Sequence, residues 1–147
     1  MGTNPCSETW PGDNAHSEPE SLAISDYILG NVPQGGWKIF LTLHSYSQLW
    51  MAPWGYTTDP PANGDDLSRA GLAAVAALET VHGTVFEYGS ASSILYPSSG
   101  TSRDWAYGVP QFEYVYTVEL RDKGAYGFVL PPEQIIPSGQ EFWEGFK

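Results

Sequence analysis

The stretch that decides the fold of this chain is Phe40-Leu41-Thr42-Leu43-His44-Ser45-Tyr46-Ser47-Gln48. Its first residues are apolar and β-prone, and it then changes to a histidine followed by four hydrogen-bonding side chains. This pattern is typical of a buried strand that leaves the core and delivers a functional group to a cleft. A second stretch, Tyr114-Val115-Tyr116-Thr117-Val118-Glu119-Leu120-Arg121-Asp122, does the same with a carboxylate. One imidazole and one glutamate at strand exits indicate a metal site with a general base.

Composition limits the class of protein. The chain has 147 residues, of which 41% are hydrophobic and 14% aromatic, enough for one domain with a packed core. Seventeen acidic residues against six basic ones give a net charge of −11. This balance argues against nucleic acid and anionic membranes as partners, and in its plainest reading it serves solubility. No apolar run approaches the ~20 residues of a membrane span, and the residues after Met1 lack a signal-peptide pattern.

Two strands are predicted strongly and two segments weakly. Lys38–Leu43 and Tyr114–Leu120 are the strong strands, and Val85–Tyr88 is a short candidate. Leu49–Tyr56 is predicted to be a loop or a short edge element, because Pro53 and Gly55 interrupt it.

Three helices are predicted. The first begins at a capping box of Ser17 and Glu20, ends at Gly30 and has as its candidate apolar face Leu22, Ala23, Tyr27 and Ile28. The second covers Asp65–Val81, is terminated by Gly83, and has as its apolar positions Leu67, Leu72, Val75, Leu78 and Val81. The third opens at Ser138. It runs to the last residue without a stop signal, so we expect that the printed chain is truncated there.

Alternating strands and helices predict an α/β fold with a mixed, mostly parallel sheet flanked by helices. Ligands of such sheets bind at the carboxyl ends of the strands, where His44 and Glu119 lie. Alone, these residues are weak signals. Catalytic zinc needs three protein ligands, and neither His16 nor His82 has a metal-binding spacing. Glu119 could equally pair with Arg121.

Several motifs occur in one order along the chain. They are Asn4-Pro5-Cys6-Ser7-Glu8-Thr9, His44-Ser45-Tyr46-Ser47-Gln48, Pro53-Trp54-Gly55-Tyr56, Tyr88-Gly89-Ser90, Leu95-Tyr96, Gly100-Thr101-Ser102-Arg103-Asp104-Trp105, Glu119-Leu120-Arg121-Asp122, Tyr126-Gly127-Phe128-Val129-Leu130-Pro131 and Gln134-Ile135-Ile136-Pro137. Together they resemble the zinc metallocarboxypeptidases of the pancreatic carboxypeptidase A/B type.

The resemblance implies a role for each matched residue. His44 would be one zinc ligand, and Glu119 the general base that takes a proton from zinc-bound water and gives it to the leaving amine. Ser45 and Tyr46 would line the substrate cleft, and Tyr96 would close over the terminal residue of a peptide. The partners would be peptide or protein carboxyl termini.

The chain also departs from the family pattern. The family's other two zinc ligands lie on a His-x-x-Glu motif, and its carboxylate-binding Asn-Arg pair is also upstream, but neither motif occurs here. We therefore expect residues 1–147 to be the carboxy-terminal portion of one catalytic domain, truncated at both ends, with one of three zinc ligands. Cys6 is a free thiol or half of a disulfide; the resemblance favours a disulfide with an upstream partner and a secreted protein.

Arg103 is the residue most informative about which terminal side chain the substrate has. In the family the corresponding position is at the base of the pocket for the terminal side chain, and an arginine there resembles the carboxypeptidase O branch. A guanidinium would select a terminal Glu or Asp, with the small residues Ala91 and Ser98 leaving room for it. The alternative is that Arg103 pairs with Asp104 and points to solvent.

Three readings stay open for the chain itself. It is part of a carboxypeptidase, a non-catalytic binding fragment that lacks zinc, or a fragment that does not fold alone. A half-sheet would expose apolar surface and an unpaired edge, which favours aggregation.

The zinc content of the isolated chain tests the first two readings. Because one histidine cannot hold zinc tightly, we expect substoichiometric metal and no detectable peptidase activity. Metal analysis after dialysis, with peptide hydrolysis measured in parallel, checks this. A stable equimolar zinc complex that turns over substrate would contradict it.

Overall fold

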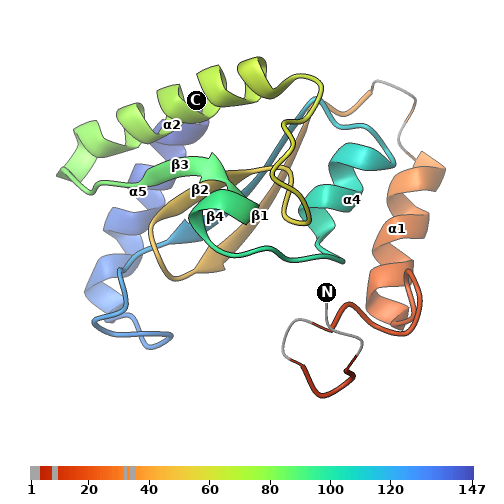
Figure 1. Ribbon diagram of the computed structural model, residues 1–147. Coiled ribbons are helices and arrows are strands. Elements are labelled where there is room, and N and C mark those ends of the chain that lie inside the picture. Colours follow the sequence, from red (N-terminus) through yellow and green to blue (C-terminus); the bar gives the residue numbers. More distant parts are fainter. Residues whose placement is uncertain (1–3, 8–9, 32, 34–35) are drawn as a thin grey trace.

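The computed structural model describes residues 4–7, 10–31, 33 and 36–147, and its centre is a mixed sheet (Figure 1). The described strands are β1 (Ile39–Ser45), β2 (Leu49–Ala52), β3 (Glu87–Ser90) and β4 (Tyr114–Leu120), in the spatial order β1-β4-β2-β3. β4 pairs with β1 in parallel and with β2 in antiparallel orientation, and β2 pairs with β3 in parallel. The predicted α/β class with a mixed, mostly parallel sheet is confirmed.

Helices cover both faces of this sheet (Figure 1). They are α1 (Pro19–Asn31), α2 (Gly64–His82), α3 (Ala91–Ile94), α4 (Ser102–Gly108) and α5 (Ile135–Phe146), with a short 3-10 helix, η1 (Pro132–Gln134), before α5. On one face, Tyr116 and Val118 of β4 pack with Leu67 and Leu78 of α2. On the other, Val115 packs with Ile28 of α1 and with Ala106 and Phe112 in and after α4. Because alternate residues of a strand point to opposite faces, β4 contributes to both cores.

The structure corrects the prediction for residues 49–56. Leu49–Ala52 is neither a loop nor an edge element but β2, a fully buried strand between β4 and β3. Pro53 and Gly55 come after the strand has ended, so they remove no hydrogen bond from the sheet. The other strands agree in type: β4 has the predicted bounds, β1 extends to Ser45, and β3 lies two residues later than expected.

The long helix α2 is confirmed, and Gly83 ends it with a positive φ of 73° and an N–H bond to the Glu79 carbonyl. Its buried face differs from the predicted one. Leu72 is 55% exposed, whereas Gly71 is buried against the Tyr88 ring, where a Cβ would overlap the ring. Residue size at the contact with β3 therefore decides the face.

The other helices depart from the prediction at their ends or in their burial. α1 begins at Pro19 rather than with Ser17 as its cap, and it continues past Gly30 to Asn31; proline suits the first helical turn. Of its predicted apolar face, Leu22 and Tyr27 are exposed and Ile28 is buried. α5 begins at Ile135 instead of Ser138. The short helices α3 and α4 were not predicted.

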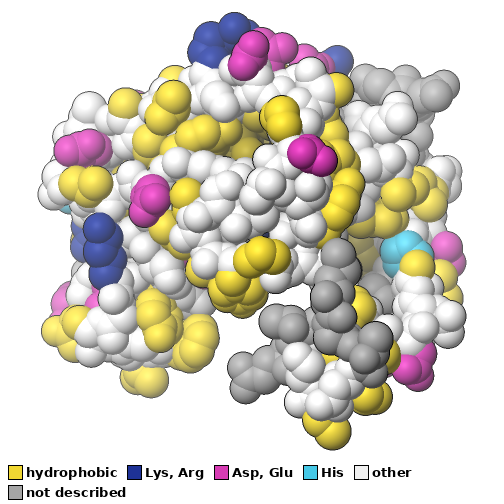
Figure 2. Space-filling view, viewed as in Figure 1, with side chains coloured by type: hydrophobic (Ala, Val, Ile, Leu, Met, Phe, Trp, Pro, Cys, Tyr) yellow, Lys and Arg dark blue, Asp and Glu magenta, His cyan; other side chains and the backbone are white. Residues whose placement is uncertain are grey.

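Two surface properties bear on partners. No helix in the described part of the chain is both long and apolar enough to cross a bilayer. Lys and Arg side chains are sparse and scattered on the face drawn in Figure 2, in keeping with six basic residues in the whole chain. The surface drawn there has no concentrated basic patch of the kind that phosphate backbones require.

A buried ion pair fastens α5 to the end of β4. Arg121 donates from Nε to Glu141 Oε2 at 2.8 Å, and a second, shorter contact joins its terminal nitrogen to Oε1. Arg121 also donates to Thr84 at 2.9 Å, and the Thr84 hydroxyl donates to Glu141 Oε1 at 2.5 Å. Glu141 is 1% exposed, so the hydrogen bonds from Arg121 and Thr84 replace those that its carboxylate would make to water.

Removing the Glu141 charge should destabilise the chain. Glu141→Gln leaves Arg121 partly buried without its counter-charge, and we expect a loss of about 3 kcal/mol of unfolding free energy, measured by urea denaturation. The matched control is Glu144→Gln on the same helix. Glu144 forms an exposed pair with Lys147, so its loss should be within about 1 kcal/mol. Equal losses for the two variants would contradict the role given to the buried pair.

Candidate active site

The register of β1 and β4 brings the two predicted chemical groups together. His44 lies opposite Glu119, and two residues earlier Thr42 lies opposite Thr117. Residues paired across parallel strands, and residues two apart along a strand, share a face. These four side chains therefore form one polar group on the α4 side of the sheet. The sequence predicted the two strand ends, and the structure shows that they are neighbours.

His44 is exposed at the end of β1. Its Nε2 lies 2.7 Å from the Thr42 hydroxyl, a bond whose direction depends on the histidine tautomer. This contact restrains the ring orientation, as an outer-shell partner of a metal-binding histidine does.

Glu119 is half-buried, and burial raises the pKa of its carboxyl above the ordinary value of 4.5, while the nearby His44 opposes the shift. The alternative that Glu119 pairs with Arg121 is wrong, because Arg121 is bound to Glu141. Among the described residues, no hydrogen bond to the Glu119 carboxylate is present. A carboxylate that is desolvated and not engaged by a cation suits proton transfer.

Of the other predicted residues, Ser45 and Tyr46 directly follow His44 in the chain. Ser45 is the last residue of β1, and the Tyr46 ring packs edge-on against Phe128 with centroids 5.1 Å apart. Tyr96 is 52% exposed in the loop between α3 and α4, as the sequence predicted. Cys6 is exposed and free, and its disulfide stays a prediction.

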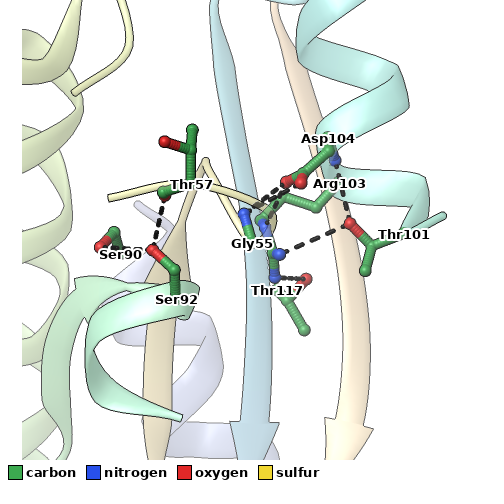
Figure 3. A network of polar contacts seen from close by, with 8 residues as sticks. All are labelled: Gly55, Thr57, Ser90, Ser92, Thr101, Arg103, Asp104 and Thr117. Atoms are coloured by element: carbon green, nitrogen blue, oxygen red, sulfur yellow. Dashed lines mark hydrogen bonds and ion pairs between the residues drawn. The ribbon is translucent and has the colours of Figure 1, made fainter. Parts of the chain in front are cut away.

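Arg103 lies in the core of a polar network beside β4 (Figure 3). Its side chain is almost fully buried, and Nε donates to Asp104 Oδ1 at 3.1 Å. One terminal nitrogen lies 3.4 Å from the Thr117 hydroxyl and the other 3.4 Å from that of Thr101. Burial lowers the Arg103 pKa, and Asp104 offsets part of that effect. The alternative reading was half right: Arg103 pairs with Asp104, but it does not point to solvent.

The backbone of Gly55 holds this network in place. Its N–H donates to both carboxylate oxygens of Asp104, at 3.0 and 2.9 Å. A Cβ on Gly55 would overlap the terminal nitrogen of Arg103 and lie 2.9 Å from the Ser98 hydroxyl. The guanidinium therefore occupies the space that a side chain at position 55 would need.

The described residues do not form a complete zinc site. No group of three His, Cys, Asp or Glu side chains in the described ranges is close enough to hold a metal ion. His44 supplies one donor of the type that zinc prefers, whereas a catalytic site needs three. The fit is therefore partial.

Comparison with known proteins shows the family of the chain. The zinc carboxypeptidase family matches residues 1–145. The chain belongs to the zinc carboxypeptidase family. It is 48% identical to "Carboxypeptidase B" of Astacus astacus, covering 98% of this chain and 47% of that protein. It is 46% identical to "Carboxypeptidase A1" of Homo sapiens, covering 96% of this chain and 33% of that protein.

Solved structures of the family share the fold. Bovine thrombin-activatable fibrinolysis inhibitor, in complex with tick carboxypeptidase inhibitor, superposes with a TM-score of 0.89 at 37% identity, over 96% of this chain and 47% of that one. Carboxypeptidase A from Helicoverpa armigera gives 0.86 at 29% identity, over 99% of this chain and 36% of that one. The chain thus spans half or less of the length of these zinc carboxypeptidases.

Sequence reasoning missed several members of this candidate site. Thr42 and Thr117 alternate with apolar residues in their strands, so only the strand register reveals that they share a face with His44 and Glu119. In the sequence, Gly55 was interpreted as a strand breaker. Its role in the network depends on the close approach of the Arg103 side chain, which is 48 residues away in the chain. In the sequence, Asp104 was considered only as an alternative ion-pair partner of Arg103.

The raised pKa of Glu119 predicts how its replacement changes stability. A group whose pKa is raised on folding contributes stability that is complete below its ordinary pKa and is lost as the pH rises through the folded pKa. Glu119→Gln should therefore be more stable than the wild type at pH 7, and this advantage should shrink at pH 4. Urea denaturation at both values measures it. The exposed Glu79→Gln is the matched control, and an equal gain in that variant would contradict the explanation.

Proposed function

We propose that residues 1–147 are the carboxy-terminal portion of a zinc carboxypeptidase catalytic domain that releases a terminal Glu or Asp. The observation that carries the proposal is the buried guanidinium of Arg103 in contact with Thr117, two residues from Glu119 and on the same sheet face. Two residues along a strand span about 7 Å, a length comparable with one amino-acid side chain. Glu119, the proposed base, and Arg103, the proposed selecting residue, are thus separated by about the length of the amino acid to be released.

The chemistry of the proposal is peptide hydrolysis. Glu119 accepts a proton from the attacking water while the water oxygen bonds to the scissile carbonyl carbon. It then delivers this proton to the amine nitrogen as the carbon–nitrogen bond breaks. The raised pKa of Glu119 brings its proton affinity closer to what both steps need. When bound, zinc would supply Lewis-acid polarisation, with His44 as one ligand.

The other residues bind substrate in this proposal. Tyr96, exposed on its loop, closes over the terminal residue, and Ser45 and Tyr46 contact the preceding part of the peptide. Arg103 pairs with an acidic terminal side chain in a pocket where a basic side chain would face like charge.

The rest of the domain would dock beside β1. β1 is an edge strand of the described sheet, and Trp37, Ile39 and Leu43 near it are exposed. An unpaired edge with apolar flanks is where further strands add. Those strands would bring the two missing zinc ligands to His44. An extracellular location and a disulfide from Cys6 complete the proposal, and both rest on the family resemblance.

The alternative function is a non-catalytic, carboxypeptidase-like binding fragment. It is favoured by the finding that the described residues bring no group of three metal-binding side chains together. The zinc measurement described above separates the two functions for the isolated chain.

A chimera tests the proposal. The chain replaces the matching half of Astacus carboxypeptidase B, and hydrolysis is measured on peptides that differ only in a terminal Glu, Lys or Phe. We expect Glu to be cleaved fastest and Lys about 100-fold or more slower, because the wrong charge would be buried beside Arg103.

Two variants sharpen this test. Arg103→Gln should reduce kcat/KM for the Glu peptide by about 100-fold with little effect on the Phe peptide, since it removes the charge-assisted pair. Glu119→Gln should abolish cleavage of all three peptides. Faster cleavage of Phe or Lys than of Glu by the unmodified chimera would refute the acidic preference.

A further inference from the structure

We propose that Asp104 is a second specificity residue, because its negative charge balances the positive charge of Arg103. The pocket then recognises a terminal side chain mainly by a hydrogen-bond acceptor oxygen, so it accepts a terminal Gln as well as a terminal Glu. This inference rests on the proposed function, in which Arg103 lies at the base of the pocket. It concerns how strongly the pocket responds to negative charge, which the presence of an arginine alone does not decide.

Asp104 is fixed independently of any substrate. Both of its carboxylate oxygens accept the Gly55 N–H, and its own N–H donates to the Thr101 hydroxyl at 3.3 Å. The side chain is about nine-tenths buried, and these bonds hold it in its present orientation. Its carboxylate is part of the buried polar network around Arg103 (Figure 3).

Asp104 bonds to Nε of the guanidinium and makes no described hydrogen bond to either terminal nitrogen. The pair uses Nε of Arg103, whereas each terminal nitrogen makes a single long contact to a threonine hydroxyl at 3.4 Å. A guanidinium has two N–H groups on each terminal nitrogen. One N–H on each is therefore without a described protein acceptor, and these can bind a substrate carbonyl or carboxylate oxygen.

No other described charge contacts the guanidinium, and the Glu119 carboxylate, two residues along β4 from Thr117, is the same in every variant compared below. The groups that contact the guanidinium besides Asp104 are the hydroxyls of Thr101 and Thr117 and the backbone region of Gly55, all neutral. Among the described residues, Asp104 is the one acid within ion-pair distance of Arg103. The buried unit formed by Arg103 and Asp104 thus has a net charge close to zero.

Distance determines how far the two charges cancel. A substrate carboxylate bonded to the terminal nitrogens would lie about 4 Å from the guanidinium centre and about 7 Å from the Asp104 carboxylate. Coulomb energy falls with the inverse of distance, so repulsion by Asp104 cancels roughly half of the attraction to Arg103. The hydrogen bonds are unaffected, and they are equally open to the amide oxygen of Gln. Glu should remain preferred, but by a modest factor.

The experiment compares peptides that end in Glu or Gln, hydrolysed by the chimera described above. In the unmodified chimera we expect kcat/KM for Glu to exceed that for Gln by about 10-fold. In Asp104→Asn, which keeps the shape and an acceptor for Gly55, the ratio should rise by about another 10-fold, because the compensating charge is gone. A purely structural defect would slow both peptides together and leave the ratio unchanged. Asp59→Asn, an exposed aspartate outside the network, is the control for total charge, with the ratio unaltered.

The outcomes separate this inference from the proposed function. A Glu to Gln ratio of about 100 or more in the unmodified chimera, where Glu is still preferred to Lys and Phe, overturns the charge balance and leaves the proposed function intact. A ratio that does not change in a folded Asp104→Asn also overturns it. If that variant does not fold, the ratio of the unmodified chimera decides alone. Preference for Lys or Phe would instead refute the proposed function.

Discussion

The pairing of β1 with β4 is the constraint on which the candidate site depends. Because the two strands are parallel and in register, His44 lies directly opposite Glu119, and Thr42 opposite Thr117. A slip of one residue would turn one of the two chemical groups to the opposite face. Buried residues of β4 hold this register. Val115 packs into the core on one face of the sheet, and Tyr116 and Val118 pack into the core on the other. Packing of the two cores therefore sets the geometry of the chemistry.

The polar network around Arg103 is assembled differently, from segments that lie apart in the sequence. Gly55 follows β2, Arg103 and Asp104 lie in α4, and Thr117 belongs to β4. A backbone N–H, a carboxylate, a guanidinium and a hydroxyl meet because each needs a partner once it is buried. The buried ion pair of Arg121 with Glu141 follows the same rule at the other end of β4. It also keeps Arg121 away from Glu119, which leaves that carboxylate for chemistry.

The described residues offer one zinc-type donor at the candidate site, where a catalytic site needs three. The chain covers 47% of one carboxypeptidase relative and 33% of another, and its edge strand β1 carries the zinc-type donor His44. A catalytic zinc site would need further ligands besides His44. The proposed roles of Glu119 in proton transfer, of Arg103 in selection and of Tyr96 in closure can each be tested separately from metal binding.

The sequence by itself determined the fold class, the two main strands, the long helix α2, the placement of His44 and Glu119 near strand ends and that of Tyr96 on a loop, because periodicity and local turn chemistry depend on neighbouring residues. The roles expected for Tyr96 and Arg103 came from the family resemblance. Only the tertiary structure decided that Leu49–Ala52 is a central strand, that Leu72 is exposed while Gly71 is buried, and that Arg103 is buried against Asp104. These outcomes depend on residues dozens of positions apart, whose size and charge act only when the fold brings them into contact.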